Sequence, residues 1–188
     1  MGKGCGDHLG DADMTSKDFF NKVANGKEDF LQLFLDVLKQ KKLSFCVIGG
    51  LGVNAYAEPL VSLDLDVVII AEKIKTLIPV LKKKFKVEVF IHSINISHKN
   101  SALRIQIQTD KRYQDFLKRS KKKDVLGYKI PVAAIQDVFQ GKVWAAMDET
   151  RRPSKRQKDL ADILRLVEVR GSLKVLLPMD LRRQLRVN

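Results

Sequence analysis

The sequence predicts an α+β fold in which a mixed sheet comes first along the chain and helices follow it. Short runs with alternating apolar residues indicate strands, and amphipathic stretches between them indicate helices. The expected strands lie at about 45–48, 65–70, 86–91 and 102–108, with a short one near 128–130. We therefore expect a flexible N-terminus over residues 1–14, a core over 15–131 and a helical subdomain over 132–188 that packs on the core.

Two helices are expected before the first strand, at 18–23 and at 28–41. The second has one apolar stripe, which would bury a single face. This stripe consists of Phe30, Leu31, Phe34, Leu35 and Leu38. A third helix is expected at 73–84, where it would connect two strands of the sheet.

The second half of the chain is basic, and its apolar residues recur largely at helical intervals. A helix is expected at 113–119, and a basic loop should then lead to the short strand near 128–130. Pro131 is expected to open a helix that ends near residue 147, because proline is favoured in a first helical turn. Ser154 is expected to cap a long helix that ends near residue 169.

The charge of the chain is strongly positive. Lysine and arginine number 35 against 22 aspartates and glutamates, a net charge of +13. The excess is clustered, at 82–86, 118–123, 151–158 and 182–186. A polyanionic partner such as RNA is the natural inference, and a solvated basic surface is the alternative. Because no known RNA-reading motif is present, recognition would rest on phosphate contacts and shape.

Composition is otherwise that of a cytoplasmic globular protein. Two cysteines give no disulfide framework. No stretch approaches ~20 uninterrupted apolar residues, so we expect no membrane span. The first residues have no apolar segment, so we expect no signal peptide.

Two acids one residue apart, Asp64 and Asp66, open the strand expected at 65–70. Side chains alternate along a strand, so both carboxylates point to the same face. Like charges on one face repel unless solvent, a basic side chain or a cation separates them. Carboxylate oxygens are the ligands that Mg²⁺ prefers. The pattern therefore suggests a divalent metal site, and an acidic strand end in solvent is the alternative.

Gly49 and Gly50 follow the strand at 45–48 and indicate a tight turn where backbone comes close to another group. A short helix is expected at 51–57, and Pro59 would end it. The amides at the start of such a helix are free to bind an anion. Strand, glycines, short helix and Asp-x-Asp together could hold a triphosphate and its metal ion.

These motifs resemble the signature of the polymerase-β-like nucleotidyltransferase superfamily. The resemblance rests on Gly49-Gly50 and on Ser62-Leu63-Asp64-Leu65-Asp66. It is strongest to the small bacterial members, the minimal nucleotidyltransferases and the AbiEii-type toxin nucleotidyltransferases. Two later segments are similar to family motifs: 132–142, which ends in a lysine, and 156–162, which reads Arg-Gln-Lys-Asp-Leu-Ala-Asp. The similarity extends from about residue 27 to 168.

The resemblance implies a nucleotidyltransferase-like mixed sheet with flanking helices and a C-terminal helical part. It implies transfer of NMP from an NTP bound with Mg²⁺ or Mn²⁺ to a hydroxyl of a nucleic acid (RNA, tRNA included) or of a protein. Membership of a toxin–antitoxin pair, with an antitoxin protein as partner, is a further implication for the small bacterial members.

The same resemblance implies roles for individual residues. Asp64 and Asp66 would be catalytic metal ligands, and Gly49, Gly50 and Ser62 would bind the nucleotide. Lys142 or Lys158 would face the phosphates, oriented by Asp159 or Asp162. The residues themselves leave another interpretation open, because Lys155–Asp159 and Lys158–Asp162 are four apart and could form surface ion pairs on one helix.

One departure from the family pattern concerns a third carboxylate, which the family usually places on a neighbouring strand. The polar face of the strand at 102–108 carries Arg104, Gln106 and Gln108 instead. A third carboxylate supports the ion that activates the attacking hydroxyl. A catalytically reduced member that binds nucleotide or RNA is therefore the first alternative.

A second alternative is a small dinucleotide-binding domain. Residues 50–55 satisfy G-x-G-x-x-A after a strand, and Glu72 lies about 20 residues further on. Against this, Pro59 makes the following helix too short, and too few strand–helix units follow.

Overall fold

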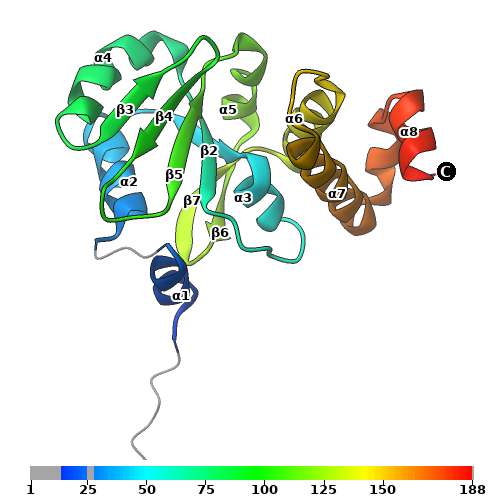
Figure 1. Ribbon diagram of the computed structural model, residues 1–188, viewed down its shortest axis with the longest axis horizontal. Helices are drawn as coiled ribbons and strands as arrows, with labels where there is room; N and C mark the ends of the chain where they lie inside the picture. Colours follow the sequence, from blue (N-terminus) through cyan, green and yellow to red (C-terminus); the bar gives the residue numbers. More distant parts are fainter. Residues whose placement is uncertain (1–13, 25–27, 188) are drawn as a thin grey trace, which may run out of the picture.

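The computed structural model describes residues 14–24 and 28–187 (Figure 1). The N-terminus expected to be flexible, residues 1–14, lies outside the described residues apart from Met14. The described strands form one seven-stranded sheet in the order β3-β4-β5-β2-β1-β7-β6. The strands are β1 (Phe45–Ile48), β2 (Asp64–Ile69), β3 (Lys86–Val89), β4 (Ser93–Ser97), β5 (Arg104–Gln108), β6 (Lys121–Val125) and β7 (Tyr128–Val132).

The sheet is mixed, which confirms the predicted α+β class. β2 runs parallel to β5 and antiparallel to β1, and β1 pairs with β7 in parallel. β3–β4, β4–β5 and β6–β7 are antiparallel pairs. The antiparallel pairing of β1 with β2 also makes the dinucleotide-binding alternative wrong, since that fold needs parallel strands on both sides of its glycine turn.

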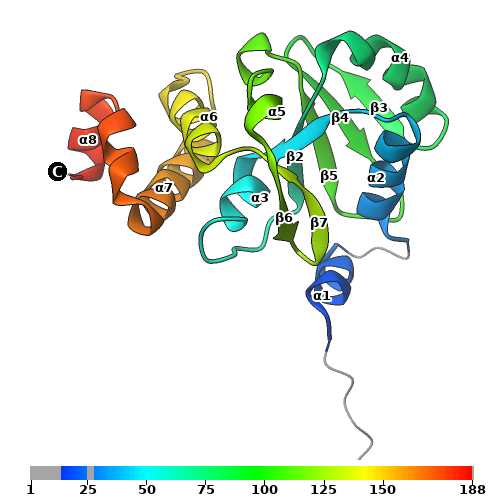
Figure 2. The ribbon, with the colours of Figure 1, turned by 180° about the vertical axis from the view of Figure 1, so that it is seen from behind.

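Helices surround the sheet unevenly. α2 and α4 lie on one face of the β3–β4–β5 part, and α6, α7 and α8 stand together beyond α3 at one side (Figures 1 and 2). No helix of the described residues is long and apolar enough to cross a bilayer. The helices are α1 (Ser16–Val23), α2 (Phe30–Gln40), α3 (Gly49–Asn54), α4 (Ala71–Lys82), α5 (Phe116–Arg119), α6 (Ile135–Met147), α7 (Pro153–Val169) and α8 (Met179–Leu185), with 3₁₀ turns η1 (Lys111–Tyr113) and η2 (Gly171–Leu176).

The core forms where the apolar stripes meet the sheet. The stripe of α2 is buried as its spacing predicts, except that Leu35 is only partly buried and Val37 joins the buried set. Leu65 and Val67 are fully buried in β2, while Asp64 and Asp66 point to the other face. The alternation of β2 therefore turns both acids away from the core.

Four expected elements differ from the structure. The segment expected as one strand at 86–91 is followed by a separate strand, β4, and the expected basic loop contains β6. Pro131 does not open a helix: it lies inside β7, and α6 begins at Ile135. Ser154 is not a cap, because α7 already begins with Pro153 in its first turn.

A further difference lies at the glycines. Gly49 and Gly50 are the first residues of α3 and do not form a separate turn before it. Gly49 has φ +64°, a left-handed conformation that side chains rarely adopt, so the chain still needs glycine there. The division into a core over 15–131 and a helical subdomain over 132–188 stays a proposal.

Candidate functional site

Asp64 lies at the start of β2 between two basic side chains. Lys155 Nζ donates to its Oδ2 at 3.1 Å, and Arg104 Nη2 lies 3.0 Å from its Oδ1. Burial works to raise the pKa of Asp64, but the Lys155 ammonium and the Arg104 guanidinium hold that pKa below its ordinary value. Asp64 is therefore ionised and balanced by protein cations.

Asp66 lies deeper on the same face of the sheet, and its negative charge is less well neutralised by basic side chains. Burial raises the pKa of Asp66, although the charge of Lys142 opposes the rise, and the neighbouring charge of Asp64 adds to it. Within the described part of the chain, no hydrogen bond or ion pair reaches its carboxylate. An acid left without a partner beside another acid favours the binding of a cation.

Gly49 is packed directly against Asp66. A Cβ at Gly49 would lie 2.0 Å from Asp66 Oδ2, so any other residue would have to displace the Asp66 side chain. At Gly50 a Cβ would lie 3.6 Å from Ser62 Oγ and 3.8 Å from Lys158 Nζ, which are ordinary contacts. Gly49 is thus required by the protein's own packing, whereas Gly50 leaves open backbone beside a hydroxyl and an ammonium.

Ser62 is buried at the turn that enters β2. Its hydroxyl lies 3.4 Å from both the backbone nitrogen and the carbonyl oxygen of Asp64. This local contact places Ser62 beside Gly50 and ties the turn to the first acid of β2.

Lys142 of α6 is held between two acids of α7. Its Nζ donates to Asp159 Oδ1 at 2.8 Å and lies 2.7 Å from Asp162 Oδ2, and the three side chains are at most 8% exposed. Burial works against the charge of Lys142, but Asp162 and Asp159 together raise its pKa above the ordinary value. The lysine is therefore charged and fixed in position.

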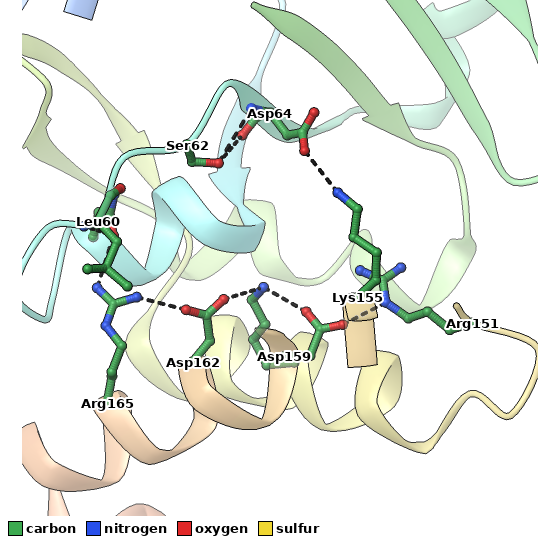
Figure 3. Close-up of polar contacts among 10 residues, drawn as sticks. Leu60, Ser62, Asp64, Arg151, Lys155, Asp159, Asp162 and Arg165 are labelled. Carbon is green, nitrogen blue, oxygen red and sulfur yellow. Dashed lines mark hydrogen bonds and ion pairs between the residues drawn. The ribbon is translucent and has the colours of Figure 1, made fainter. Parts of the chain in front are cut away.

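The same acids are held from outside by two arginines (Figure 3). Arg151 Nε donates to Asp159 Oδ2 at 2.6 Å, and Arg165 Nη1 donates to Asp162 Oδ1 at 2.7 Å. Arg165 also donates to Asn54 Oδ1 and to the carbonyl of Glu58. The network thus connects α6 and α7 to the segment that precedes β2.

This arrangement shows that the surface ion pairs considered for α7 do not form. Asp159 and Asp162 turn inward to Lys142, and Lys155 reaches across to Asp64 (Figure 3). Lys158 makes no ion pair with a described residue and lies beside Gly50. The four-residue spacing on α7 therefore does not determine which residue each charged side chain pairs with.

The two groups of residues face one cleft of about 510 Å³. Gly49, Asp64, Asp66, Lys142 and Asp159 line it. Gly50, Ser62, Lys158 and Asp162 lie next to these residues, outside the lining itself. The structure also adds basic lining residues that the sequence did not place in the site, and these are Arg104, Arg151, Arg152 and Lys155.

The third carboxylate is absent from the strand where it was sought. In the register of β2 with β5, Arg104 lies opposite Asp64 and Gln106 opposite Asp66. Glu88 lies two strands beyond β5, because β4 intervenes, and pairs with Lys86 at 2.9 Å. No group of three or more potential metal-binding side chains occurs in the described ranges. Two carboxylates fit an ion that takes its remaining ligands from phosphate oxygens and water.

Comparison with known proteins identifies the fold. No protein-family model and no curated protein sequence matches the chain significantly. Among solved structures, the chain is similar to the lincosamide antibiotic adenylyltransferase LnuA with lincomycin bound, with a TM-score of 0.52 and 15% identity over 76% of this chain and 99% of that one. ANT(2'')-Ia in complex with adenylyl-2''-tobramycin matches with a TM-score of 0.56 and 13% identity over 83% and 94% of the two chains.

A Thermotoga maritima protein assigned as a nucleotidyltransferase matches with a TM-score of 0.51 and 17% identity over 73% of this chain and 96% of that one. These matches confirm that the chain shares the fold of these nucleotidyltransferase structures.

Proposed function

We propose that this protein transfers an NMP group from a metal-bound NTP to a hydroxyl. One observation carries the proposal: an Asp-x-Asp pair with an unpartnered second carboxylate faces, across one cleft, a buried lysine fixed by two acids. A nucleotidyltransferase needs both a cation-binding pair for the triphosphate and preorganised positive charge near it.

Asp64 and Asp66 would hold the Mg²⁺ or Mn²⁺ that enters with the NTP, and the bound ion would stabilise negative charge on the phosphates. Gly50 and Ser62 would contact the triphosphate, because open backbone and a hydroxyl meet there. Gly49 would shape this site by admitting Asp66. Lys158 would add positive charge beside them.

Lys142 would direct a fixed charge at the cleft, and Asp159 and Asp162 would act as positioning residues for it. In the transfer, the acceptor oxygen would bond to the α-phosphorus while the bond to the pyrophosphate oxygen breaks. Pyrophosphate would leave, and the acceptor proton would pass to solvent.

The acceptor in this proposal is a hydroxyl of RNA, tRNA included, or of a protein. The net charge of +13 and the basic lining of the cleft favour an anionic acceptor. A toxin–antitoxin role with a protein antitoxin belongs to the same proposal and is supported by the sequence resemblance. A cytoplasmic location also belongs to it and is supported by the composition.

A second candidate is a catalytically reduced protein that binds nucleotide or RNA. Its support is specific: Arg104 stands opposite Asp64 where an acid would help to hold a second ion, and Gln106 stands opposite Asp66. Binding would then survive while turnover is slow or needs a partner.

Incubation with each radiolabelled NTP, magnesium and total RNA separates the candidates. Label on RNA or on protein supports transfer and names the acceptor class. The matched control is Asp64→Ala with Asp66→Ala, which should remove all label transfer. Magnesium-dependent NTP binding without any transfer would favour the second candidate.

A further inference from the structure

One face of β3, β4 and β5 is open. α2 and α4 lie against the other face, and no described helix lies over β3 and β4 on the side shown in Figure 1. The alternation of the strands matches this, since Ile94, Ile96, Ile105 and Ile107 are buried and the residues between them are not. The polar residues between these isoleucines therefore point to the open face.

Strand register arranges the open face into two rows. We define the amide row as Asp66, Gln106, Asn95 and Glu88, which are direct cross-strand neighbours from β2 to β3. We define the basic row as Asp64, Arg104, Ser97 and Lys86, which are neighbours in the same order. Since strands lie about 4.8 Å apart, each row extends about 14 Å from the acids to the sheet edge.

The amide row contains polar groups that the protein itself does not satisfy. Asn95 Oδ1 is buried without a hydrogen-bond partner. The side chain of Gln106, and that of Ser97 in the basic row, also make no hydrogen bond to a described residue. Gln108, which lies outside both rows, accepts from two backbone amides. Buried polar groups in folded proteins are almost always paired. Asn95 and Gln106 line the cleft, so their free hydrogen-bonding groups can be used by a bound ligand.

The basic row presents positively charged side chains that can contact a nucleic-acid backbone. The side chains of Arg104 and Lys86 are 70% and 72% exposed, and they lie two strands apart. Each pairs with one acid, Asp64 or Glu88, but most of each side chain is accessible. Exposed arginine and lysine at such positions can contact phosphates.

We propose that the open face binds the single-stranded end of a nucleic-acid acceptor. Bases contact Gln106 and Asn95, because a carboxamide matches the paired donor and acceptor of a base edge. Phosphates contact Arg104 and Lys86. A single strand is required because only unpaired bases expose these edges fully. The placement of the terminal hydroxyl beside Asp64 and Asp66 rests on the proposed function, whereas the binding itself does not.

The test compares Asn95→Ala/Gln106→Ala with Gln40→Ala, which removes an exposed amide at the end of α2 on the covered side. Fluorescence anisotropy measures the Kd of a labelled single-stranded RNA oligonucleotide. We expect the double variant to bind about tenfold more weakly or worse, as loss of base-edge contacts implies, and Gln40→Ala to match the wild type. Equal Kd values for all three proteins, or no binding by the wild type, would overturn the proposal.

Lys86→Ala is an independent variant at an exposed position, so it does not depend on the fold tolerating two changes in the cleft. We expect it to weaken binding equally for oligonucleotides of different sequence. The slope of log K against log salt should fall by about 0.7, the value for one phosphate contact to a single strand. A sequence-dependent loss, or an unchanged slope, would contradict the basic row.

Magnesium-dependent NTP binding by the same proteins separates this proposal from the proposed function. Loss of RNA affinity in Asn95→Ala/Gln106→Ala with NTP affinity retained supports both. If the double variant loses RNA affinity and the wild type does not bind NTP, the open-face proposal is supported and the proposed function is refuted. If the double variant binds NTP normally and its RNA affinity is unchanged, only the open-face proposal is refuted.

Discussion

Two pairs of acids lie in or beside the cleft, and they are neutralised in opposite ways. Asp159 and Asp162 on α7 are buried, and Lys142, Arg151 and Arg165 balance them. Asp64 and Asp66 on β2 face the cleft, and only Asp64 has basic partners. The α7 pair is complete without a ligand, whereas the β2 pair is not.

This difference separates a pair that holds Lys142 in position from a pair that can bind a ligand. Burying charge costs free energy that only close pairing offsets, so the α7 pair must keep its partners for the fold to persist. The β2 pair stays accessible and keeps one carboxylate free, which favours binding of a cation. Mutations should therefore affect stability at α7 and ligand binding at β2.

Lys142→Ala should produce the largest loss of stability. It leaves Asp159 and Asp162 buried with fewer partners, and breaking a buried ion pair costs about 3–5 kcal/mol of unfolding free energy. Urea unfolding measures this value. The matched control is Lys155→Ala, which removes a half-exposed partner of Asp64 and should cost under about 1 kcal/mol. Similar losses for both variants would remove the distinction between the two pairs.

Gly49→Ala should cause the next largest loss of stability. Its Cβ would lie 2.0 Å from Asp66 Oδ2 in a left-handed backbone, so we expect a cost of about 1–3 kcal/mol. Gly50→Ala is the control and should change stability little, because its Cβ meets only ordinary contacts. Gly50→Val should instead weaken NTP affinity by obstructing the backbone. If thermal unfolding shows Gly50→Ala to be the more damaging change, the assignment of the two glycines is reversed.

Arg104→Gln should have the smallest effect on stability. The arginine is largely exposed, and surface ion pairs contribute about 0–1 kcal/mol. Chemical denaturation should place this variant within that range of the wild type. A loss as large as that of Lys142→Ala would mean that the β2 pair is as structural as the α7 pair.

Sequence reasoning predicted the features that depend on local periodicity. Alternation placed Asp64 and Asp66 on one face, and the apolar stripe of α2 is buried largely as expected. Ser93–Ser97 alternates in the same way, so β4 was detectable, although no strand was expected there. β6 was harder to recognise, because lysines disfavour strands in general and are tolerated at a sheet edge.

Features that depend on distant partners were not predictable. Four-residue spacing on α7 allows Asp159 and Asp162 to meet lysines of their own helix, and only the packing of α6 brings Lys142 to them. Lys155 meets Asp64 from 91 positions away. The glycines did indicate a close approach, but the group that approaches Gly49 is the protein's own Asp66.

The most direct test is magnesium-dependent NTP binding by the wild type and by Asp64→Ala/Asp66→Ala, measured by isothermal titration calorimetry. Asp180→Ala, at an exposed acid of α8, is the matched control. The account predicts that the wild type and Asp180→Ala bind NTP only with the metal ion, and that the double variant does not bind although it unfolds at the wild-type temperature or above. Equal magnesium-dependent affinity in the double variant would contradict the central claim that these two carboxylates hold the nucleotide's metal ion.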